Sequence, residues 1–270
     1  MTSSKKLSKL TLTLLICVTF SLFGCSSNKN KDRYADWTAE QLYNRAAKMV
    51  KNDQNREAIK VYDALDSHFP FGAYTEQGHL DVIYAYYEED DMPGALASAD
   101  RFIQMHPRSP RLDYAYYMRG LAKFHENTGF LEKNLWLNPT YRQTNPDRES
   151  FNYFNQLVNR FPGSPYSTDA RQRMIYLRNS LAQSELHVAY WYIRRGAYLA
   201  AANRGRYIIE HFEHSTAVPD ALSVMVYCYH QLSLDILADD AERVLRANYP
   251  DNRGLEKLEH YKEFHPFGFL

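Results

Sequence analysis

The sequence predicts an all-α fold, a superhelical solenoid of five similar helix pairs. Five segments share one framework: a small residue, then twelve positions later a proline or its substitute, preceded by an aromatic residue or histidine. The five end points lie 37, 55, 51 and 37 residues apart. Large apolar residues also recur at fixed positions within the segments. Repeats of this length indicate helix pairs that bury their apolar faces only by stacking on one another.

The framework residues occur in every unit. The small residues are Ala58, Ala95, Ser150, Ala201 and Ala238, and the end points are Pro70, Pro107, Pro162, Glu213 and Pro250. Five residues before each end point is an apolar anchor: Leu65, Phe102, Leu157, Ile208 and Leu245. Nine residues before the small residue, four units carry Met49, Tyr86, Tyr192 and Tyr229. This spacing is typical of tetratricopeptide repeats, in which a large residue of the first helix faces a small one of the second.

The same pattern fixes where each helix begins and ends. A proline ends a second helix because its ring and its missing N–H cannot continue the hydrogen-bond ladder. Gly72, Ser109, Ser164 and Ser215 then begin the next turn. The expected pairs are 38–51 with 54–69, 76–90 with 92–106, 110–126 with 147–161, 167–195 with 197–213, and 217–232 with 235–249.

Two stretches depart from the regular unit. Residues 127–146 interrupt the third pair with a loop rich in Asn, Pro and Thr, which is either functional or a surface loop held by Trp136. Residues 166–195 lack Gly and Pro and predict a helix of about 45 Å. Its apolar residues Met174, Leu177, Leu181, Val188 and Trp191 follow a heptad-like line broken at Ser184. The added length is close to four turns, so the extra turns can project without disturbing the stack.

The first 25 residues resemble a bacterial lipoprotein signal. Three lysines precede an apolar run, residues 10–23, that is too short to span a bilayer, and Cys25 follows it. We expect a signal peptide at 1–24, acylation of Cys25 by chains such as palmitate, and a polar tether over 25–36. The alternative is a secretory peptide or membrane anchor that happens to contain this cysteine. Ser26 resembles the residue that sends lipoproteins to the outer membrane.

Composition narrows the class of protein. The chain has 32 basic and 32 acidic residues, and the expected signal removes three lysines and no acid, which leaves the mature protein at −3. This balance argues against a nucleic-acid binder. Without Cys25, the mature chain keeps Cys228 alone, so no internal disulfide is expected. One continuous solenoid over 37–250 and a tail over 251–270 account for the remainder.

No motif predicts catalysis, a metal site or a cofactor. His211 and His214 lie beside Glu213 without the further ligands that zinc needs, and are better explained as helix-end residues. Glu149-Ser150 resembles the Glu-Ser of lytic transglycosylases, but Ser150 is already the small residue of its repeat. We therefore expect a binding protein and no enzyme.

Tyrosines on the first helices indicate where a peptide could bind. Leu80, Tyr84 and Tyr87 form a separate stripe, which either lines a peptide groove or packs on the neighbouring repeat. Two arginines nearby could bind a carboxylate. The candidate groove residues are Phe71, Tyr74, Tyr84, Tyr87, Arg101, Tyr117 and Arg119.

Several longer runs carry a specific resemblance. They are residues 69–74, 80–87, 100–103, 117–121, 168–170, 195–197 and 218–222. With these runs and the cysteine motif, nearly the whole chain resembles the BamD family of outer-membrane assembly lipoproteins. The loop around Trp136 and the tail after Asp251 do not map onto that family.

The resemblance implies a scaffold, lipid-anchored on the periplasmic face of a Gram-negative outer membrane. Its N-terminal repeats would receive the C-terminal signal of unfolded barrel substrates, and its C-terminal repeats would dock the periplasmic domains of the barrel subunit. Accessory assembly lipoproteins are further implied partners. The docking arginine matches Arg204, with Asn203 and Arg195 beside it in the same stretch. Alternatives are an envelope adaptor for peptidoglycan-remodelling enzymes and a cell-wall lyase using Glu149.

Overall fold

The computed structural model describes residues 33–126 and 145–258, and the chain divides into two units after Thr38. In the first unit, the described residues form a turn. The N–H of Trp37 donates to the carbonyl oxygen of Tyr34 at 3.0 Å, and the two rings meet edge to face with centroids 5.5 Å apart. The prediction for Cys25, most of the loop predicted at 127–146 and residues 259–270 of the tail predicted at 251–270 lie outside the described residues. Asn145 and Pro146 belong to a helix and not to the loop, and Leu258 of the tail is buried in a hydrophobic cluster.

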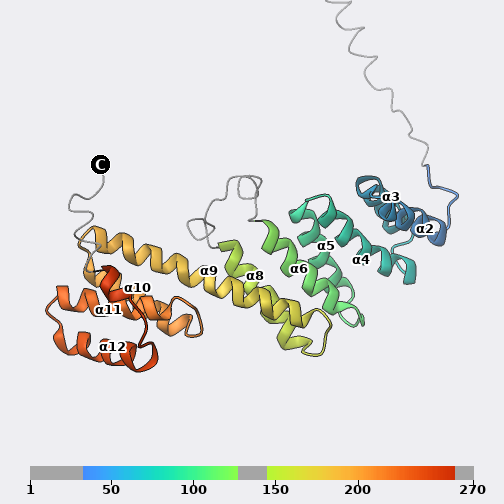
Figure 1. Cartoon of the computed structure of the whole chain (residues 1–270). Coiled ribbons are helices and arrows are strands. Elements are labelled where there is room, and N and C mark those ends of the chain that lie inside the picture. Colours follow the sequence, from blue (N-terminus) through green and yellow to red (C-terminus); the bar gives the residue numbers. More distant parts are fainter. Residues whose placement is uncertain (1–32, 127–144, 259–270) are drawn as a thin grey trace, which may run out of the picture. The chain divides into compact units, whose positions relative to one another are not determined.

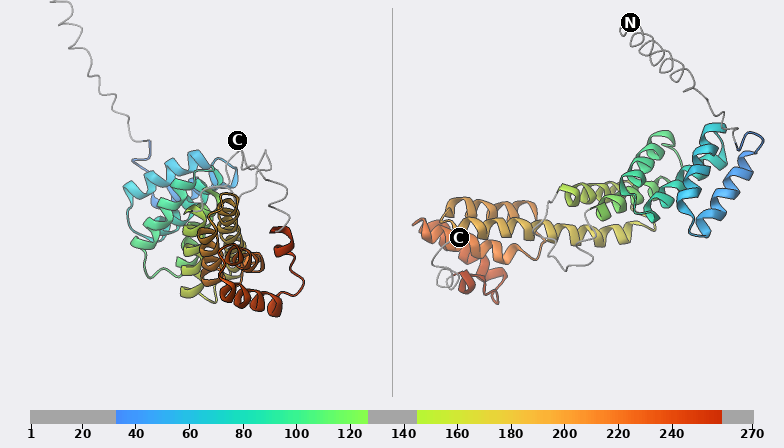
Figure 2. Two further views of the ribbon diagram at one scale, coloured as in Figure 1. Left: turned by 90° about the vertical axis from the view of Figure 1, so that its left-hand side faces the viewer. Right: turned by 90° about the horizontal axis from the view of Figure 1, so that it is seen from above.

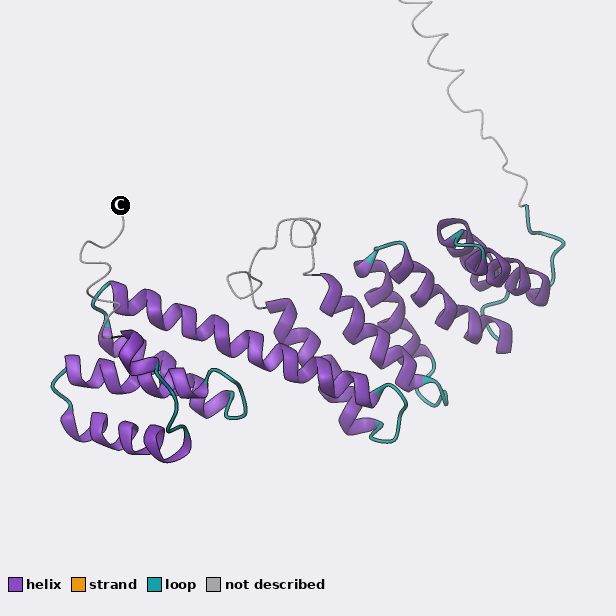
Figure 3. Cartoon of the chain, in the orientation of Figure 1, coloured by secondary structure: helices purple, strands orange, loops and turns teal. Residues whose placement is uncertain are grey.

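From Ala39 onward, the described residues form helices joined by short turns, without a strand among them (Figures 1 and 3). The pairs are α2 (Ala39–Lys51) with α3 (Asn55–His68), α4 (Ala73–Glu88) with α5 (Met92–Met105), α6 (Leu112–Glu126) with α8 (Asn145–Arg160), α9 (Ser167–Arg194) with α10 (Tyr198–His211), and α11 (Val218–Gln231) with α12 (Asp235–Asn248). Each helix packs on the next one in the chain, as the views in Figure 2 also show. The five predicted helix pairs are confirmed.

The first helices of adjacent pairs also touch, since α4 contacts both α2 and α6, and α9 contacts α11. Within 33–126 and 145–258, no helix combines the length and the apolar character that crossing a membrane requires.

Small residues allow the paired helices to approach closely. All five repeat positions, Ala58, Ala95, Ser150, Ala201 and Ala238, are 0% exposed. In the third pair, the Ser150 hydroxyl donates to the carbonyl oxygen of Gly120 at 3.1 Å, and a Cβ on Gly120 would come within 2.5 Å of the Phe154 ring. A larger side chain at this crossing would push α6 and α8 apart.

Every second helix ends in the same way. The residue after the helix leaves helical geometry, and its N–H donates to the carbonyl oxygen of the apolar anchor at 2.8–2.9 Å. The donor and acceptor pairs are Phe69 with Leu65, His106 with Phe102, Phe161 with Leu157, Phe212 with Ile208, and Tyr249 with Leu245. Four of these five donors precede a proline, which disfavours helical geometry in the residue before it.

The turn inside each regular pair needs a left-handed residue. Asp53, Asp90 and Ser233 have φ of 57°, 59° and 57°, and Gly196 has 70°. They occupy equivalent positions in the first, second, fifth and fourth pairs. The left-handed region costs an ordinary L-residue about 1–2 kcal/mol, whereas glycine adopts it freely.

The long helix α9 joins two hydrophobic clusters. Its first half contributes Ala170 and Leu177 to a cluster with α4, α5, α6 and α8, and its second half contributes Leu186, Ala189 and Ile193 to a cluster with α10 and α11. The added turns therefore do not project from the stack. The heptad-like line was wrong in this second half, where Val188 and Trp191 are exposed, because α10 contacts a different face of the helix.

Cys228 belongs to the second cluster and is fully buried. Burial raises the pKa of its thiol to about 12, so it stays protonated and unreactive in the folded protein.

The turn between α9 and α10 gives a direct test of backbone strain. A Cβ at Gly196 would meet nothing within 4 Å, so Gly196→Ala changes only the backbone preference. We expect it to lower the free energy of unfolding by roughly 1 kcal/mol, after allowance for the stiffer unfolded chain. Urea denaturation measures this change. Gly163→Ala is the matched control because its site is equally open and its φ is not left-handed, so it should be neutral or slightly stabilising.

Candidate functional site

The predicted groove residues on α4 have two different environments. Leu80 is buried and Tyr87 half-buried, and both pack in the cluster that includes α6 and α8. Tyr84 is 42% exposed. The stripe therefore packs mainly on the neighbouring pair, which is one of the two interpretations given above. Tyr84 stays exposed on the surface formed by the first helices α4, α6 and α9. We call this surface the first-helix face.

Tyr117 lies on α6 in the same region. Its hydroxyl donates to Oδ2 of Asp169 on α9 at 2.8 Å, and its ring stacks on Tyr166 with centroids 4.8 Å apart. Arg173 donates to the same Asp169 oxygen at 2.6 Å and lies over the Phe124 ring at 5.0 Å. We name these five residues the α6–α9 cluster: Tyr117, Phe124, Tyr166, Asp169 and Arg173.

Electrostatic interactions within this cluster keep Asp169 charged and Tyr117 neutral. Burial, reinforced by Asp169, raises the pKa of Tyr117 to about 12. Burial alone would raise the pKa of Asp169, but hydrogen bonds from Arg173 and Tyr117 outweigh it and hold that pKa below its usual value. Tyr87 is within electrostatic reach of both Asp169 and Arg173. The first-helix face therefore presents aromatic rings beside a paired guanidinium, a mixture suited to an extended peptide.

Phe71 and Tyr74 lie at the start of α4. Phe71, in the turn after α3, is 88% exposed, and Tyr74 packs its ring 5.6 Å from that of Tyr43 on α2. No contact given for these residues joins them to the α6–α9 cluster.

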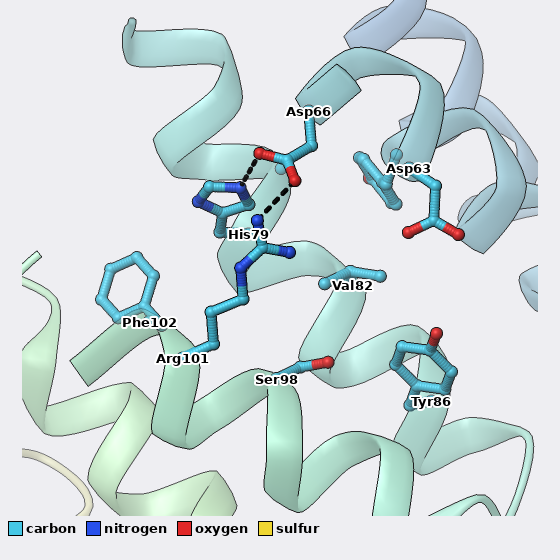
Figure 4. Close-up of a pocket in the computed structure, with 10 residues that line it drawn as sticks. Asp63, Asp66, His79, Val82, Tyr86, Ser98, Arg101 and Phe102 are labelled. Atoms are coloured by element: carbon cyan, nitrogen blue, oxygen red, sulfur yellow. Dashed lines mark hydrogen bonds and ion pairs between the residues drawn. The ribbon is translucent and has the colours of Figure 1, made fainter. Parts of the chain in front are cut away.

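Arg101 lies on α5, in a pocket lined by α3, α4 and α5 with a cavity volume of about 100 Å³ (Figure 4). Its Nη2 donates to Oδ2 of Asp66 at 2.5 Å, while His79 contacts Oδ1 of the same carboxylate at 2.8 Å. Burial would raise the pKa of Asp66, but the hydrogen bonds from His79 and Arg101 hold it below its usual value. Asp66 thus takes one donor of Arg101, which was predicted to bind a ligand carboxylate, while the Arg101 side chain stays 55% exposed.

Arg119 points away from the first-helix face. Its side chain is 12% exposed, pairs with Asp100 of α5 at 3.0 Å and donates to Gln156 of α8 at 2.6 Å. The rings of Tyr116 and Tyr153 lie 4.8 and 4.3 Å from its guanidinium carbon. The seven predicted groove residues therefore do not form one site, since Tyr84, Tyr87 and Tyr117 share a face and Arg101 and Arg119 contact second helices.

The predicted docking residues are distributed along α9 and α10. Arg204 on α10 pairs with Glu185 of α9 at 2.9 Å. Asn203 is exposed and accepts a hydrogen bond from Arg206 at 3.1 Å. Arg195 lies over the exposed Trp191 ring at 3.9 Å. Ten residues separate Arg195 from Glu185, about 15 Å along a helix, so Arg195 and Arg204 form neighbouring but separate contacts.

Two residues that the sequence analysis did not single out complete the Arg204 contact. Arg148 of α8 donates to the second oxygen of Glu185 at 3.1 Å and to the Tyr207 hydroxyl at 3.3 Å. Residues 148, 185 and 204 come from three helices. A signal within one repeat could not reveal this contact, because it crosses from the third helix pair to the fourth.

Glu149 and Ser150 have structural roles. Glu149 pairs with Lys123 of α6 at 2.9 Å, and the buried Ser150 hydroxyl is occupied by the Gly120 carbonyl. This arrangement fixes α6 against α8 and offers Ser150 no contact with a substrate.

The pocket residue His79 and its neighbour His106 predict a pH dependence of stability. His106 follows α5, and its Nε2 lies 3.0 Å from Nδ1 of His79. Burial lowers the pKa of His106, Glu76 opposes this, and His79 lowers it further. The folded protein favours the neutral form of His106. The stability that this contributes to the fold is complete at pH values above the ordinary histidine pKa, near 6.5, and is lost as pH falls below that value.

We expect His106→Gln to lose less unfolding free energy than the wild type between pH 7.5 and pH 5. Urea denaturation at each pH measures the loss. His214→Gln, at an exposed histidine after α10, should keep the wild-type dependence. Identical pH profiles for His106→Gln and the wild type would show that this contact does not titrate.

Comparisons with known proteins agree with the resemblance noted in the sequence. The family model described as "YfiO: Outer membrane lipoprotein" matches residues 35–244. Three relatives carry the name "Outer membrane protein assembly factor BamD". That of Neisseria meningitidis serogroup B is 37% identical over 90% of this chain and 93% of its own. That of Vibrio cholerae is 36% identical over 84% and 93%, and that of Pasteurella multocida 33% over 96% and 96%. The chain belongs to the YfiO family of outer membrane lipoproteins, which includes these BamD assembly factors.

Proposed function

We propose that this protein is a non-catalytic scaffold of the outer-membrane protein assembly machinery, held on the periplasmic face by lipid on Cys25. The observation that carries the proposal is the match, over most of the chain, to relatives named as outer membrane protein assembly factors. A solenoid suits this role because each helix pair adds surface without requiring a new core. Unfolded barrel proteins, a barrel subunit and accessory lipoproteins are the proposed partners.

Two separate surfaces support a scaffold with two protein partners. The first-helix face carries Tyr84 and the α6–α9 cluster, where the C-terminal segment of a barrel substrate could bind through aromatic contacts and hydrogen bonds. About a helix pair further along the chain, α9 and α10 present Arg204 to solvent, with its side chain 42% exposed. We assign this second surface to the periplasmic domains of the barrel subunit. One scaffold could then hold substrate and barrel subunit together.

Charge reversal tests the docking surface. Arg204→Glu should greatly reduce recovery of the barrel subunit, because the partner would meet a carboxylate in place of a guanidinium. The measurement is a pull-down on a C-terminal tag from gently solubilised outer membranes, with mass spectrometry of the bound proteins. Arg246→Glu is the matched control, since Arg246 is also a surface arginine paired with a carboxylate, Glu242 on α12.

Far-UV circular dichroism should show equal helicity for both variants. Undiminished recovery of the barrel subunit with Arg204→Glu would reject the docking assignment. Recovery of murein fragments or cell-wall enzymes by the wild type would favour an adaptor for peptidoglycan remodelling.

A labelled peptide tests the first-helix face. Tyr84→Ala should weaken binding of a synthetic peptide with the C-terminal sequence of an outer-membrane barrel protein by roughly five- to tenfold, the usual effect of removing an aromatic contact. Fluorescence anisotropy measures the affinity. Leu237→Ala on α12 is the control, because it removes a similarly exposed apolar side chain outside this face. Equal losses in both variants would contradict a peptide site at Tyr84.

A further inference from the structure

Glu185 lies between two arginines from different helices. Its Oε1 accepts from Nη2 of Arg148 on α8 at 3.1 Å, and its Oε2 accepts from Nη1 of Arg204 on α10 at 2.9 Å. Both oxygens of one carboxylate thus hold a guanidinium, and the two guanidiniums come from different helices that pack on α9. Tyr207, one turn after Arg204 on α10, receives a further hydrogen bond from Arg148 at 3.3 Å.

The depth of the three side chains shows which of them faces a partner. The Glu185 side chain is 13% exposed, whereas those of Arg148 and Arg204 are 38% and 42% exposed. The carboxylate therefore lies beneath two guanidiniums that reach solvent. Two positive charges against one negative charge leave this group of three with a net charge of +1.

Arg204 keeps unused donors. A guanidinium carries five N–H donors in a fixed fork, and the contact with Glu185 is the hydrogen bond that the described residues give to Arg204. A carboxylate arriving from solvent could therefore bind the outer edge of this fork with both oxygens. Without Glu185, the two guanidiniums would repel each other and lose the group that fixes their rotamers.

We propose that Glu185 is a positioning residue, which holds Arg148 and Arg204 together as one binding site for a carboxylate side chain of the docked partner. This inference rests on the proposed function of Arg204 and adds two elements to it. Arg148 becomes a second contact for the same acidic group, and the mostly buried carboxylate of Glu185 becomes part of a site that binds acids. Because α8, α9 and α10 each supply one residue, the site exists only where the third and fourth helix pairs pack together.

The direction in which one substitution changes the binding affinity separates positioning from simple charge attraction. Glu185→Gln makes the surface more positive, so charge attraction alone predicts tighter binding of an acidic partner. Positioning predicts weaker binding, by on the order of tenfold, because the guanidiniums are released from their fixed orientation. Arg148→Gln should weaken binding to a similar extent. The probe is the purified periplasmic fragment of the barrel protein recovered in the pull-down, titrated by calorimetry at low and moderate salt.

Glu242→Gln on α12 is the matched control, since Glu242 also accepts two hydrogen bonds, both from Arg246. It should leave the affinity unchanged. Binding is measured at a temperature at which circular dichroism shows every variant folded. If Glu185→Gln does not fold, Glu185→Asp replaces it, because the shorter side chain keeps the charge but cannot reach both arginines.

The outcomes distinguish this inference from the proposed function. Loss of binding in Arg204→Glu, Arg148→Gln and Glu185→Gln, with Glu242→Gln unaffected, supports the positioning role. Unchanged or tighter binding by Glu185→Gln, or unchanged binding by Glu185→Asp where that variant is used, would overturn it even if Arg204→Glu abolishes binding. Undiminished binding by Arg204→Glu would instead reject the docking surface itself.

Discussion

The close crossing of paired helices at a small residue is the constraint on which the whole array depends. Ala58, Ala95, Ala201 and Ala238 are fully buried, and where the third pair uses Ser150, its hydroxyl finds a backbone carbonyl on the partner helix. Close approach lets the apolar anchor of each second helix reach its neighbours. It also fixes where each second helix must stop, so that the following turn can deliver the next first helix onto the existing surface.

The helix α9 modifies this regular scheme without breaking it. The first helices also pack on neighbouring pairs, but α9 is long enough for its two halves to enter two separate hydrophobic clusters. Beside the second of these clusters, residues of α8, α9 and α10 meet. The Arg148, Glu185 and Arg204 group lies there, so the departure from the repeat length creates a surface that five identical units would not contain.

The sequence predicted the elements well because their signals are local. The spacing of small residue, anchor and proline lies within a single unit, and all five pairs were found within three residues of their ends. The sites were harder to predict because they combine side chains of different units. Arg119 was predicted to line the groove and bind a carboxylate, yet its position on α6 directs it against α5 and α8, where Asp100 and two rings surround it. The same limit applies to Glu185, whose two partners are 37 and 19 residues away.

The buried thiol of Cys228 links folding to redox chemistry. In an oxidising compartment, an unfolded chain would expose this cysteine. In the lipid-anchored mature chain proposed above, Cys25 is occupied by lipid, so any disulfide that Cys228 formed would join it to another molecule. Once α11 packs between α10 and α12, the sulfur is inaccessible and its pKa is far above neutral, so attack on a disulfide stops. Formation of the last hydrophobic cluster therefore ends the period in which oxidation can trap the chain, and slow packing of α11 would lengthen that period.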